Sequence, residues 1–409
     1  MELKAKTAYK QTELGFIPEN WLINGLTETS TLKARIGWQG LTTSEYLNNG
    51  EYFLLTGTDF DGGKIKWDTC HYVSKVRFDQ DKNIQVKIQD ILITKDGTIG
   101  KVAFVDRLPL NATLNSGIFV IRPKKNNYVP LYLFFIFNSG YFNDFLKKLV
   151  AGSTISHLYQ KDFINFRFPL PPTLEEQTAI TNVLSDTDSL INSLEKLIAK
   201  KKLIKQGAMQ KLLSPKKGWE VKKLGEIGEC IIGLTYKPEN VKKFGKLVLR
   251  SSNIQNGQLC YENNVFVDIE IPEKLVLKEN DILICVRNGS RDLIGKSSLI
   301  KGKAIGETFG AFMSVYRSDY NTFISLVFQS DIIKKQIDEH LGATINQITN
   351  KSLNSFIVPF PPLNEQTKIA TILSDMDAEI TALEAKLEKY RQLKQGMMQN
   401  LLTGKIRLV

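Results

Sequence analysis

The sequence predicts an α+β chain in which two mixed α/β globular modules alternate with two long helices that pack as an antiparallel coiled coil. The first observation is an internal repeat, because residues 177–214 recur at 366–403 with a constant offset of 189 residues and eighteen of thirty-eight positions identical. The second is a heptad pattern of apolar residues inside both copies. The third is that the segments before the two copies also resemble each other. Together these observations predict that the two halves of the chain are related by pseudo-two-fold symmetry.

The heptad pattern is more complete in the second helix than in the first. Thr187 and Lys201 interrupt the first copy, so we expect this helix to be the weaker former of a coil with itself. In the second copy the apolar positions alternate in steps of four and three, at Ile369, Leu373, Met376, Ile380, Leu383, Leu387 and Tyr390.

Start and stop signals frame both helices. Thr173 stands three residues before Glu176, which is the spacing of a capping box, and Asn364 is a candidate N-cap of the second helix. The helices are expected to end at Ser214 and Thr403, which precede a proline and a glycine. A helix of about 39 residues is roughly 58 Å long.

The globular modules share short strand-like runs and longer helical stretches. Residues 90–97 parallel residues 281–289, and residues 118–121 form another apolar run of the β type. Helical stretches are expected at 129–150 and 322–341. The predicted organisation is a first module at 1–149, a linker and helix at 150–214, a second module at 215–340, and a linker and helix at 341–409.

Composition limits the class of protein and of partner. Lys and Arg exceed Asp and Glu by 54 to 43, which gives a net charge of +11 and indicates a polyanionic partner. The N-terminus lacks an apolar region typical of secretion signals, and neither long helix is apolar enough to span a bilayer. Four scattered cysteines without a C-x-x-C pair fit a reducing compartment, so we expect a cytoplasmic protein with no membrane association and no structural zinc.

No catalytic motif is present. Residues 289–297 resemble a phosphate-binding loop, but five residues separate Gly289 from Gly295 where that loop has four. A strand followed by a glycine turn, shared by both modules, explains the segment better. We therefore expect no catalysis by this chain alone and no bound metal.

Several stretches that differ between the modules combine basic, amide and aromatic side chains. Such side chains contact base edges and phosphates of DNA. The candidate DNA-binding residues are Lys33, Arg35, Trp38, Gln39 and Lys95 in the first module, and Lys237, Arg250, Asn253, Gln255, Arg287 and Arg291 in the second.

The chain resembles the specificity subunits of type I DNA restriction–modification systems over essentially its whole length. The resemblance is carried by Pro-Leu-Pro-Pro and Pro-Phe-Pro-Pro before the helices, by the Leu-Ser-Asp motif, and by Lys-Gln-Gly-x-Met-Gln-x-Leu-Leu in both helices. Residues 9–21 and 90–101 are also similar to this family. The second module departs from the latter pattern, because residues 291–294 lengthen the turn before Gly295.

The resemblance implies that each module is a target-recognition domain that reads one half of a bipartite, asymmetric sequence in double-stranded DNA. It also implies that the helices set the gap and dock two methyltransferase subunits, which bring S-adenosylmethionine. Restriction subunits with an ATP-dependent motor would complete the complex, and ATP and Mg²⁺ are expected on partner subunits rather than on this chain.

Two other classes of function remain compatible with the residues alone. A coiled-coil scaffold that carries two protein-binding modules would explain the helices, and it would be indifferent to DNA across a salt titration. A nucleotide-dependent enzyme would need a working phosphate site, and the spacing of residues 289–297 counts against one.

Overall fold

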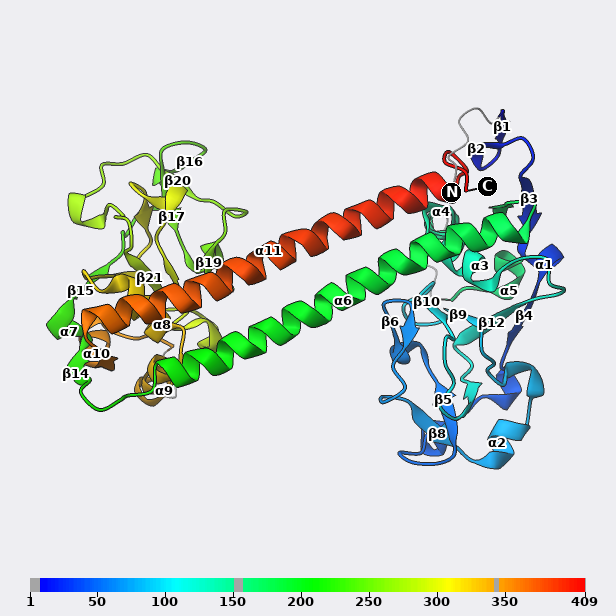
Figure 1. The fold of residues 1–409 in the computed structure, drawn as a ribbon, viewed down its shortest axis with the longest axis horizontal. Coiled ribbons are helices and arrows are strands. Elements are labelled where there is room, and N and C mark those ends of the chain that lie inside the picture. The colour runs from blue at the N-terminus through cyan, green and yellow to red at the C-terminus, as the bar shows by residue number, and fades with distance from the viewer. Residues whose placement is uncertain (1–7, 151–156, 342–345, 409) are drawn as a thin grey trace. The chain divides into compact units, whose positions relative to one another are not determined.

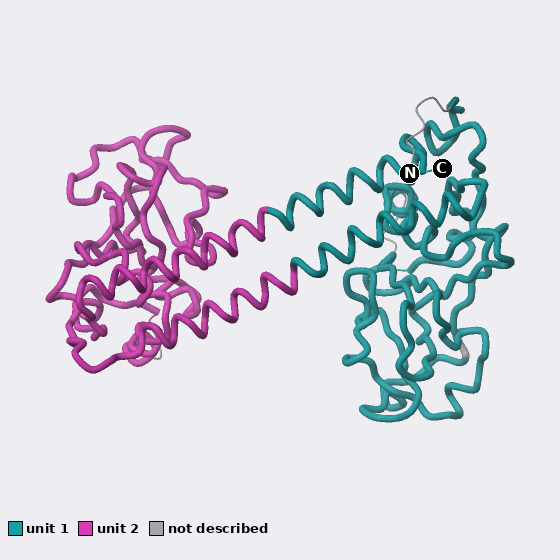
Figure 2. Tube along the Cα trace, in the orientation of Figure 1, with its two compact units in different colours: residues 1–194, 386–409 teal, residues 195–385 magenta. Residues whose placement is uncertain are grey.

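The computed structural model describes residues 8–150, 157–341 and 346–408, except for the side chains of Trp38 and Val150. The chain divides into two compact units (Figure 2): unit 1 comprises residues 1–194 and 386–409, and unit 2 comprises residues 195–385. Each unit thus combines one globular module with parts of both long helices. The prediction from the sequence instead places each helix, with its linker, in a segment separate from the modules.

The two long helices are α6 (Leu174–Leu212) and α11 (Leu363–Leu401), each of 39 residues (Figure 1). The backbone N–H of Glu176 donates to Thr173 Oγ1 over 3.2 Å. The side chain of Thr173 therefore caps the first helix, as predicted. The prediction of Asn364 as an N-cap is wrong, because α11 already begins at Leu363.

The helices run antiparallel within each unit. In unit 1, Asp188 of α6 forms a salt bridge with Lys394 of α11, while Glu176 near the start of α6 pairs with Arg407 beyond the end of α11. The guanidinium of Arg407 donates to both carboxylate oxygens of Glu176, and both side chains are buried.

Unit 2 contains the same arrangement. Lys205 pairs with Asp377 and Lys201 pairs with Glu379 over 2.6 Å, so positions rise along one helix as they fall along the other. Lys205 and Asp377 occupy the repeat positions of Lys394 and Asp188, which means that the duplicated helices make one ion pair twice.

The heptad positions lie on the inner side of the helices. Ile180, Leu184, Leu373 and Leu387 are buried. The polar residue Thr187, which interrupts the first copy, is accommodated locally: its hydroxyl donates to the carbonyl of Val183 over 2.9 Å. The prediction of a coiled-coil contact between the duplicated helices is confirmed within each unit.

Two sheets of more than two strands are present among the described residues of the module in unit 1. One is antiparallel, with the order β10 (Val102–Phe104), β9 (Ile91–Thr94), β12 (Ile118–Pro123), β4 (Ser30–Ala34). In the other, β5 (Tyr52–Leu55) lies between β11 (Asn111–Leu114), which is parallel to it, and β8 (His71–Val73), which is antiparallel.

The module of unit 2 repeats this topology. Its antiparallel sheet has the order β22 (Ser297–Leu299), β21 (Ile282–Cys285), β24 (Met313–Arg317), β15 (Glu229–Ile232). In its second sheet, β17 (Lys246–Leu249) is parallel to β23 (Thr308–Phe309) and antiparallel to β20 (Phe266–Val267), which also pairs with β16 (Val241–Lys242). The predicted duplication of the modules is confirmed at the level of strand order.

Short strand pairs and helices complete the units. The two predicted helical stretches are each broken once, into α3 (Pro130–Phe137) and α4 (Gly140–Val150), and into α8 (Asn321–Phe328) and α9 (Asp331–His340). The remaining strand pairs are β1 (Tyr9–Thr12) with β2 (Gly15–Pro18), β3 (Leu22–Gly25) with β13 (Arg167–Leu170), β6 (Phe60–Asp61) with β7 (Lys64–Ile65), β14 (Glu220–Lys223) with β25 (Ile357–Phe360), and β18 (Ile254–Gln255) with β19 (Gln258–Leu259). The remaining helices are α1 (Leu26–Thr29), α2 (Lys75–Asp79), α5 (Gln160–Phe163), α7 (Leu224–Ile227) and α10 (Asn350–Ser355).

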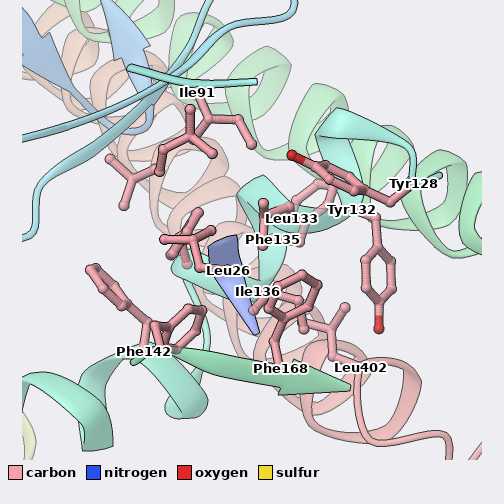
Figure 3. Packing of buried hydrophobic residues seen from close by; sticks show 14 of the residues in the cluster. Leu26, Ile91, Tyr128, Tyr132, Leu133, Phe135, Ile136, Phe142, Phe168 and Leu402 are labelled. Atoms are coloured by element: carbon pink, nitrogen blue, oxygen red, sulfur yellow. The ribbon is translucent and has the colours of Figure 1, made fainter. Parts of the chain in front are cut away.

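A core rich in aromatic residues joins the module of unit 1 to its helices. Figure 3 shows Ile91 of the sheet, Phe135 of α3 and Phe142 of α4 in this cluster together with Leu402, which follows α11. The segment that directly follows α11 is therefore part of the core of the first unit. Removal of buried side chains of this size typically costs about 2–5 kcal/mol.

Each module also contains one buried carboxylate held by an arginine of the next strand. Asp90 accepts two hydrogen bonds from Arg122, both of 2.7 Å, and Asp281 accepts two from Arg317, of 2.8 and 2.6 Å. Both carboxylates also cap a backbone N–H three residues earlier in the chain. The modules therefore share their internal polar contacts as well as their strands.

The glycine turn predicted for both modules is a β-hairpin. Strands β9 and β10 form it in unit 1, and β21 and β22 form it in unit 2. Gly100 and Gly295 close the two turns by donating to the carbonyls of Thr94 and Cys285 over 2.9 and 2.8 Å. The rejection of a phosphate-binding loop at residues 289–297 is consistent with this hairpin.

Candidate nucleic-acid interface

Two of the candidate DNA-binding residues of the first module come from β4 and from the end of β9, the strands on either side of β12 in one sheet. Lys33 is an exposed residue of β4, whose neighbour Ala34 pairs with Phe119 of β12. Lys95 directly follows β9, and its ammonium lies 5.3 Å from the ring centroid of Phe119. The cation and the ring hold each other in place at the end of the sheet.

Arg35 and Gln39 do not belong to an exposed surface. Arg35 is only 2% exposed and donates to the Leu114 carbonyl over 2.8 Å and to Thr113 Oγ1 over 3.2 Å. Burial lowers the pKa of its guanidinium, and the nearby Arg77 adds to that effect. Gln39 is buried as well. Since a buried side chain cannot reach a base edge, the prediction that these two residues read DNA needs correction. Unlike Arg35, Gln39 has a buried side-chain oxygen, Oε1, with no hydrogen-bond partner among the described residues. The side chain of Trp38 lies outside the described residues.

In the second module the same correction applies to Asn253. This residue is fully buried, and its side chain accepts the Arg250 backbone N–H and donates to the Cys260 carbonyl over 2.9 Å. Asp59 makes the corresponding bond to the N–H of Thr56 in the first module. Asn253 therefore stabilises a turn that both modules contain.

Three other candidates of the second module are more accessible and lie on separate segments of it. Gln255 is exposed on the short strand β18. Lys237 is exposed and lies 3.8 Å from Glu239. The exposed Arg291 donates to the carbonyl of Asp338 in α9 over 3.3 Å, so it contacts the helix that packs behind the hairpin.

Arg250 and Arg287 belong to segments that contact each other. Arg250 is half-buried and donates to the Asn263 carbonyl over 3.1 Å. Ser251, the next residue, accepts a hydrogen bond of 3.1 Å from the side chain of Asn288, which follows Arg287. Two of the predicted residues are thus brought to neighbouring loops at one end of the module.

Sequence reasoning missed the aromatic partner of Arg287. The guanidinium lies 5.1 Å from the ring centroid of Phe312, and 58% of this phenylalanine is exposed. The signal in the sequence was a phenylalanine directly before β24 (Met313–Arg317), at a position where the other module has a glycine. It could have been found by comparing the repeats, because the first module has Gly117 at this point, two residues before Phe119.

A second missed group lies in the first module. His157 Nδ1 is bonded to Asp96 Oδ1, and its ring centroid is 4.6 Å from that of Tyr159. Tyr159 is exposed, and the ammonium of Lys161 lies 5.5 Å from its ring centroid. No repeat of spacing or charge marks these residues in the sequence, because they come from segments about sixty positions apart.

Among the described residues there is no group of three or more His, Cys, Asp or Glu that could hold a metal ion. Burial raises the pKa of the Cys70 and Cys230 thiols to about 12, so neither is a ready nucleophile at neutral pH. No helix in the described part of the chain has the length and apolar character needed to cross a membrane.

Comparison with known proteins agrees with this arrangement. The model of the type I restriction modification DNA specificity domain matches the chain twice, at residues 39–206 and 216–394. Two proteins of Methanocaldococcus jannaschii, named as the MjaX and MjaVIII specificity subunits of type I restriction enzymes, are each 30% identical to the chain. The alignment with MjaX covers 98% of this chain and 97% of that protein, and the alignment with MjaVIII covers 80% and 81%.

A solved structure supports the fold. The type I restriction–modification S subunit from M. genitalium superposes with a TM-score of 0.58 at 16% identity, covering 94% of this chain and 96% of that one. Two matches to the domain model, two repeated modules and near full-length coverage of the relatives lead to one assignment. The chain belongs to the family of specificity (S) subunits of type I DNA restriction–modification systems and carries two DNA specificity domains.

Proposed function

We propose that the two modules read the two different halves of a bipartite DNA sequence, while the long helices set the gap between the halves. The observation that carries this proposal is the relation between the modules. They share strand order, buried ion pairs and hairpin turns, but their exposed loops carry different side chains. Two unlike readers built on one scaffold are suited to an asymmetric site.

The charge of the chain supports DNA as the partner. The net charge of +11 is accompanied by exposed lysines and arginines in both modules. Binding to a duplex by such residues releases counterions, so affinity should fall steeply with salt. An affinity that did not change with salt, or no affinity for DNA, would instead favour the protein-binding scaffold.

The helices are also proposed to dock two methyltransferase subunits. Glutamines and glycines of the repeated Lys-Gln-Gly-x-Met-Gln motif are identical in both helices and exposed or half-exposed. Folding does not require the two helices to carry identical residues at exposed positions. Binding of the same kind of partner to both helices does require it. These residues are Gln206, Gly207 and Gln210 in α6, and Gln395, Gly396 and Gln399 in α11.

In unit 1 this motif borders a cavity of about 790 Å³ between α4 and the end of α11. Gln395, Met398 and Gln399 line it on one side, and Tyr141 and Phe145 of α4 line it on the other. The cavity gives a partner side chain a place to insert. Docked methyltransferases would supply S-adenosylmethionine, and restriction subunits would add the ATP- and Mg²⁺-dependent motor.

Methylome sequencing tests the reading function directly. A host that carries this chain with its partner subunits should show adenine methylation at one bipartite motif with a gap of constant length. Each helix of 39 residues is about 58 Å long, which corresponds to roughly 17 base pairs and is an upper limit on the gap. A continuous motif, or a gap of variable length, would contradict the proposal.

An insertion tests whether the helices set the gap. Four residues added after Lys200 lengthen α6 by about 6 Å, close to two base pairs. They also disturb the heptads, so some loss of stability is expected. A lengthened variant that retains full activity on the original spacing would count against this role of the helices.

A further inference from the structure

One point of the scaffold carries the same backbone hydrogen bonds in both modules but different side chains. In unit 1, the N–H of Lys95 donates to the carbonyl of Gly117, and the carbonyl of Lys95 accepts the N–H of Leu158, both over 2.8 Å. The residues that follow and precede these, Asp96 and His157, form an antiparallel bridge. Three segments far apart in sequence therefore meet where strand β9 ends.

The second module has the same bonds at the end of β21. The N–H of Val286 donates to the carbonyl of Phe312 over 3.1 Å, and its own carbonyl accepts the N–H of Ile348 over 2.8 Å. Arg287 and Gln347 form the antiparallel bridge. Asp96, Gly117 and His157 of the first module thus correspond to Arg287, Phe312 and Gln347 of the second.

The side chains at this point in unit 2 are held for an outside contact. Arg287 and Phe312 stack against each other, and both are exposed. Among the residues that the structure describes, the guanidinium of Arg287 contacts only this ring and forms no ion pair, so its hydrogen-bonding groups are available. Gln347 is exposed beside them.

The loop that carries Arg287 is also fixed from both sides. The side chain of Asn288 donates to Ser251 Oγ over 3.1 Å, and the side chain of Asn346 donates to the carbonyl of Gly289 over 3.0 Å. A loop already ordered before binding loses less conformational entropy when it meets its ligand. Such bracing is expected of a specific contact more than of a mobile phosphate contact.

We infer that this point is the specificity-determining contact of each module, formed by Arg287, Phe312 and Gln347 in the second and by Asp96 and His157 in the first. The inference rests on the proposed function, since it assumes that each module reads one half-site. It explains why the side chains differ here although the surrounding backbone bonds are the same. A shared scaffold with exchanged side chains is what two different half-sites require.

The chemistry of these side chains indicates which bases they select. An arginine presents two parallel donors that match N7 and O6 of guanine, an aromatic ring can contact the methyl group of thymine, and a glutamine matches N6 and N7 of adenine. The Oδ1 atom of Asp96 is bonded to His157, and the other carboxylate oxygen, which can only accept hydrogen bonds when ionised, suits the amino group of cytosine. We therefore expect a guanine in the half-site read by the second module.

The test is methylome sequencing of the assembled complex with single substitutions. Arg287→Ala should reduce discrimination at one guanine of the second half-site by roughly tenfold or more, and should leave the first half-site unchanged. Phe312→Ala should relax a neighbouring position of the same half-site. Asp96→Asn should change only the first half-site, which gives a reciprocal result within one protein.

Lys335→Ala provides a control. This lysine is exposed on α9 and is not one of the candidate DNA-binding residues, so its removal should leave both half-sites unchanged. The thermal midpoint of every variant should be measured, because a folded variant is needed for the comparison.

The outcomes separate the inference from the function on which it rests. If the unmodified complex recognises no bipartite motif, the proposed function fails. If it does, but Arg287→Ala and Phe312→Ala leave the second half-site unchanged, only the inference fails. A uniform loss of affinity for all sequences would identify Arg287 as a phosphate contact and would also overturn the inference.

Discussion

The two modules agree in the buried polar contacts of their interiors and differ in the side chains of their loops. Asp90 with Arg122 and Asp281 with Arg317 form the same bidentate pair in equivalent strands. At the ends of β9 and β21, by contrast, an acidic residue stands where the other module has Arg287. The comparison teaches that buried polar residues shared by both modules maintain the fold, and that exposed residues in matched backbone positions are free to differ.

The largest effect should come from removal of one module altogether. A fragment of residues 1–214 retains one module and α6, and two copies can pair antiparallel because Lys205 is equivalent to Lys394 and can meet Asp188 of the other copy. With methyltransferase partners, its recognition site should become an inverted repeat of the first half-site. Methylation mapping and analytical ultracentrifugation measure both consequences.

The fragment dimer should be weaker than the intact chain. It lacks Arg407, so the buried carboxylate of Glu176 loses its partner, and it lacks Leu402 from the aromatic core. A fragment that remains monomeric at high micromolar concentration, even with its partners, would show that the pairing depends on residues unique to the second helix.

The next largest effect concerns the shared ion pairs. Asp281→Ala leaves the half-buried Arg317 without its carboxylate and should lower the free energy of unfolding by roughly 3 kcal/mol. Asp90→Ala should have a similar cost in the other module, because its geometry is the same. Denaturant unfolding measures the loss, and Asp79→Ala, which removes only an exposed pair with Lys75, is the control.

Base preference should be unaffected by these substitutions. If Asp281→Ala altered the second half-site while the variant remained folded, the separation between maintaining the fold and reading DNA would be wrong. The unequal case is also informative, since a much smaller cost for Asp90→Ala would show that the two scaffolds are alike in geometry but not in energy.

The hairpin glycines should show a smaller effect. A Cβ added to Gly295 would lie 2.2 Å from Ile337 Cδ1, and the backbone there has φ +83°, which other residues rarely adopt. Gly295→Ala should therefore destabilise by about 1–3 kcal/mol. Gly97→Ala is the matched comparison, because its φ is also positive but nothing lies within 4 Å of the added carbon. Thermal unfolding should show the smaller loss for Gly97.

Much of this fold could be predicted from repetition alone. The offset of 189 residues identified α6 and α11, and the duplicated runs at residues 90–97 and 281–289 identified equivalent strands. Strand order could not be derived, because pairing between distant strands leaves no local pattern. The predicted N-cap at Asn364 puts the start of α11 two residues late, since a proline stands where the first helix has Thr173.

The candidate site was predicted less well, and burial is the reason. Arg35 and Asn253 have side chains that bind DNA in other settings, but here they satisfy buried backbone groups. Composition cannot distinguish an internal partner from an external one. The repeat itself contained the missing information for Asn253, because Asp59 occupies the same turn in the first module.

The smallest effect, and the one most specific to partner docking, is expected at the helix glycines. Gly207 and Gly396 lie inside α6 and α11, and open space surrounds the place of a Cβ at both. Alanine is a better helix former than glycine by about 1 kcal/mol, so Gly207→Ala should raise the thermal stability of the free chain.

If methyltransferase subunits approach the helix closely at this position, the same substitution should weaken their binding by several fold in a titration. Ser189→Ala, an exposed change elsewhere on α6, should leave the affinity unchanged. Opposite signs for stability and docking would explain why a residue unfavourable in helices occurs at the same place in both copies. A variant that is more stable and also binds its partners fully would remove these glycines from the docking surface.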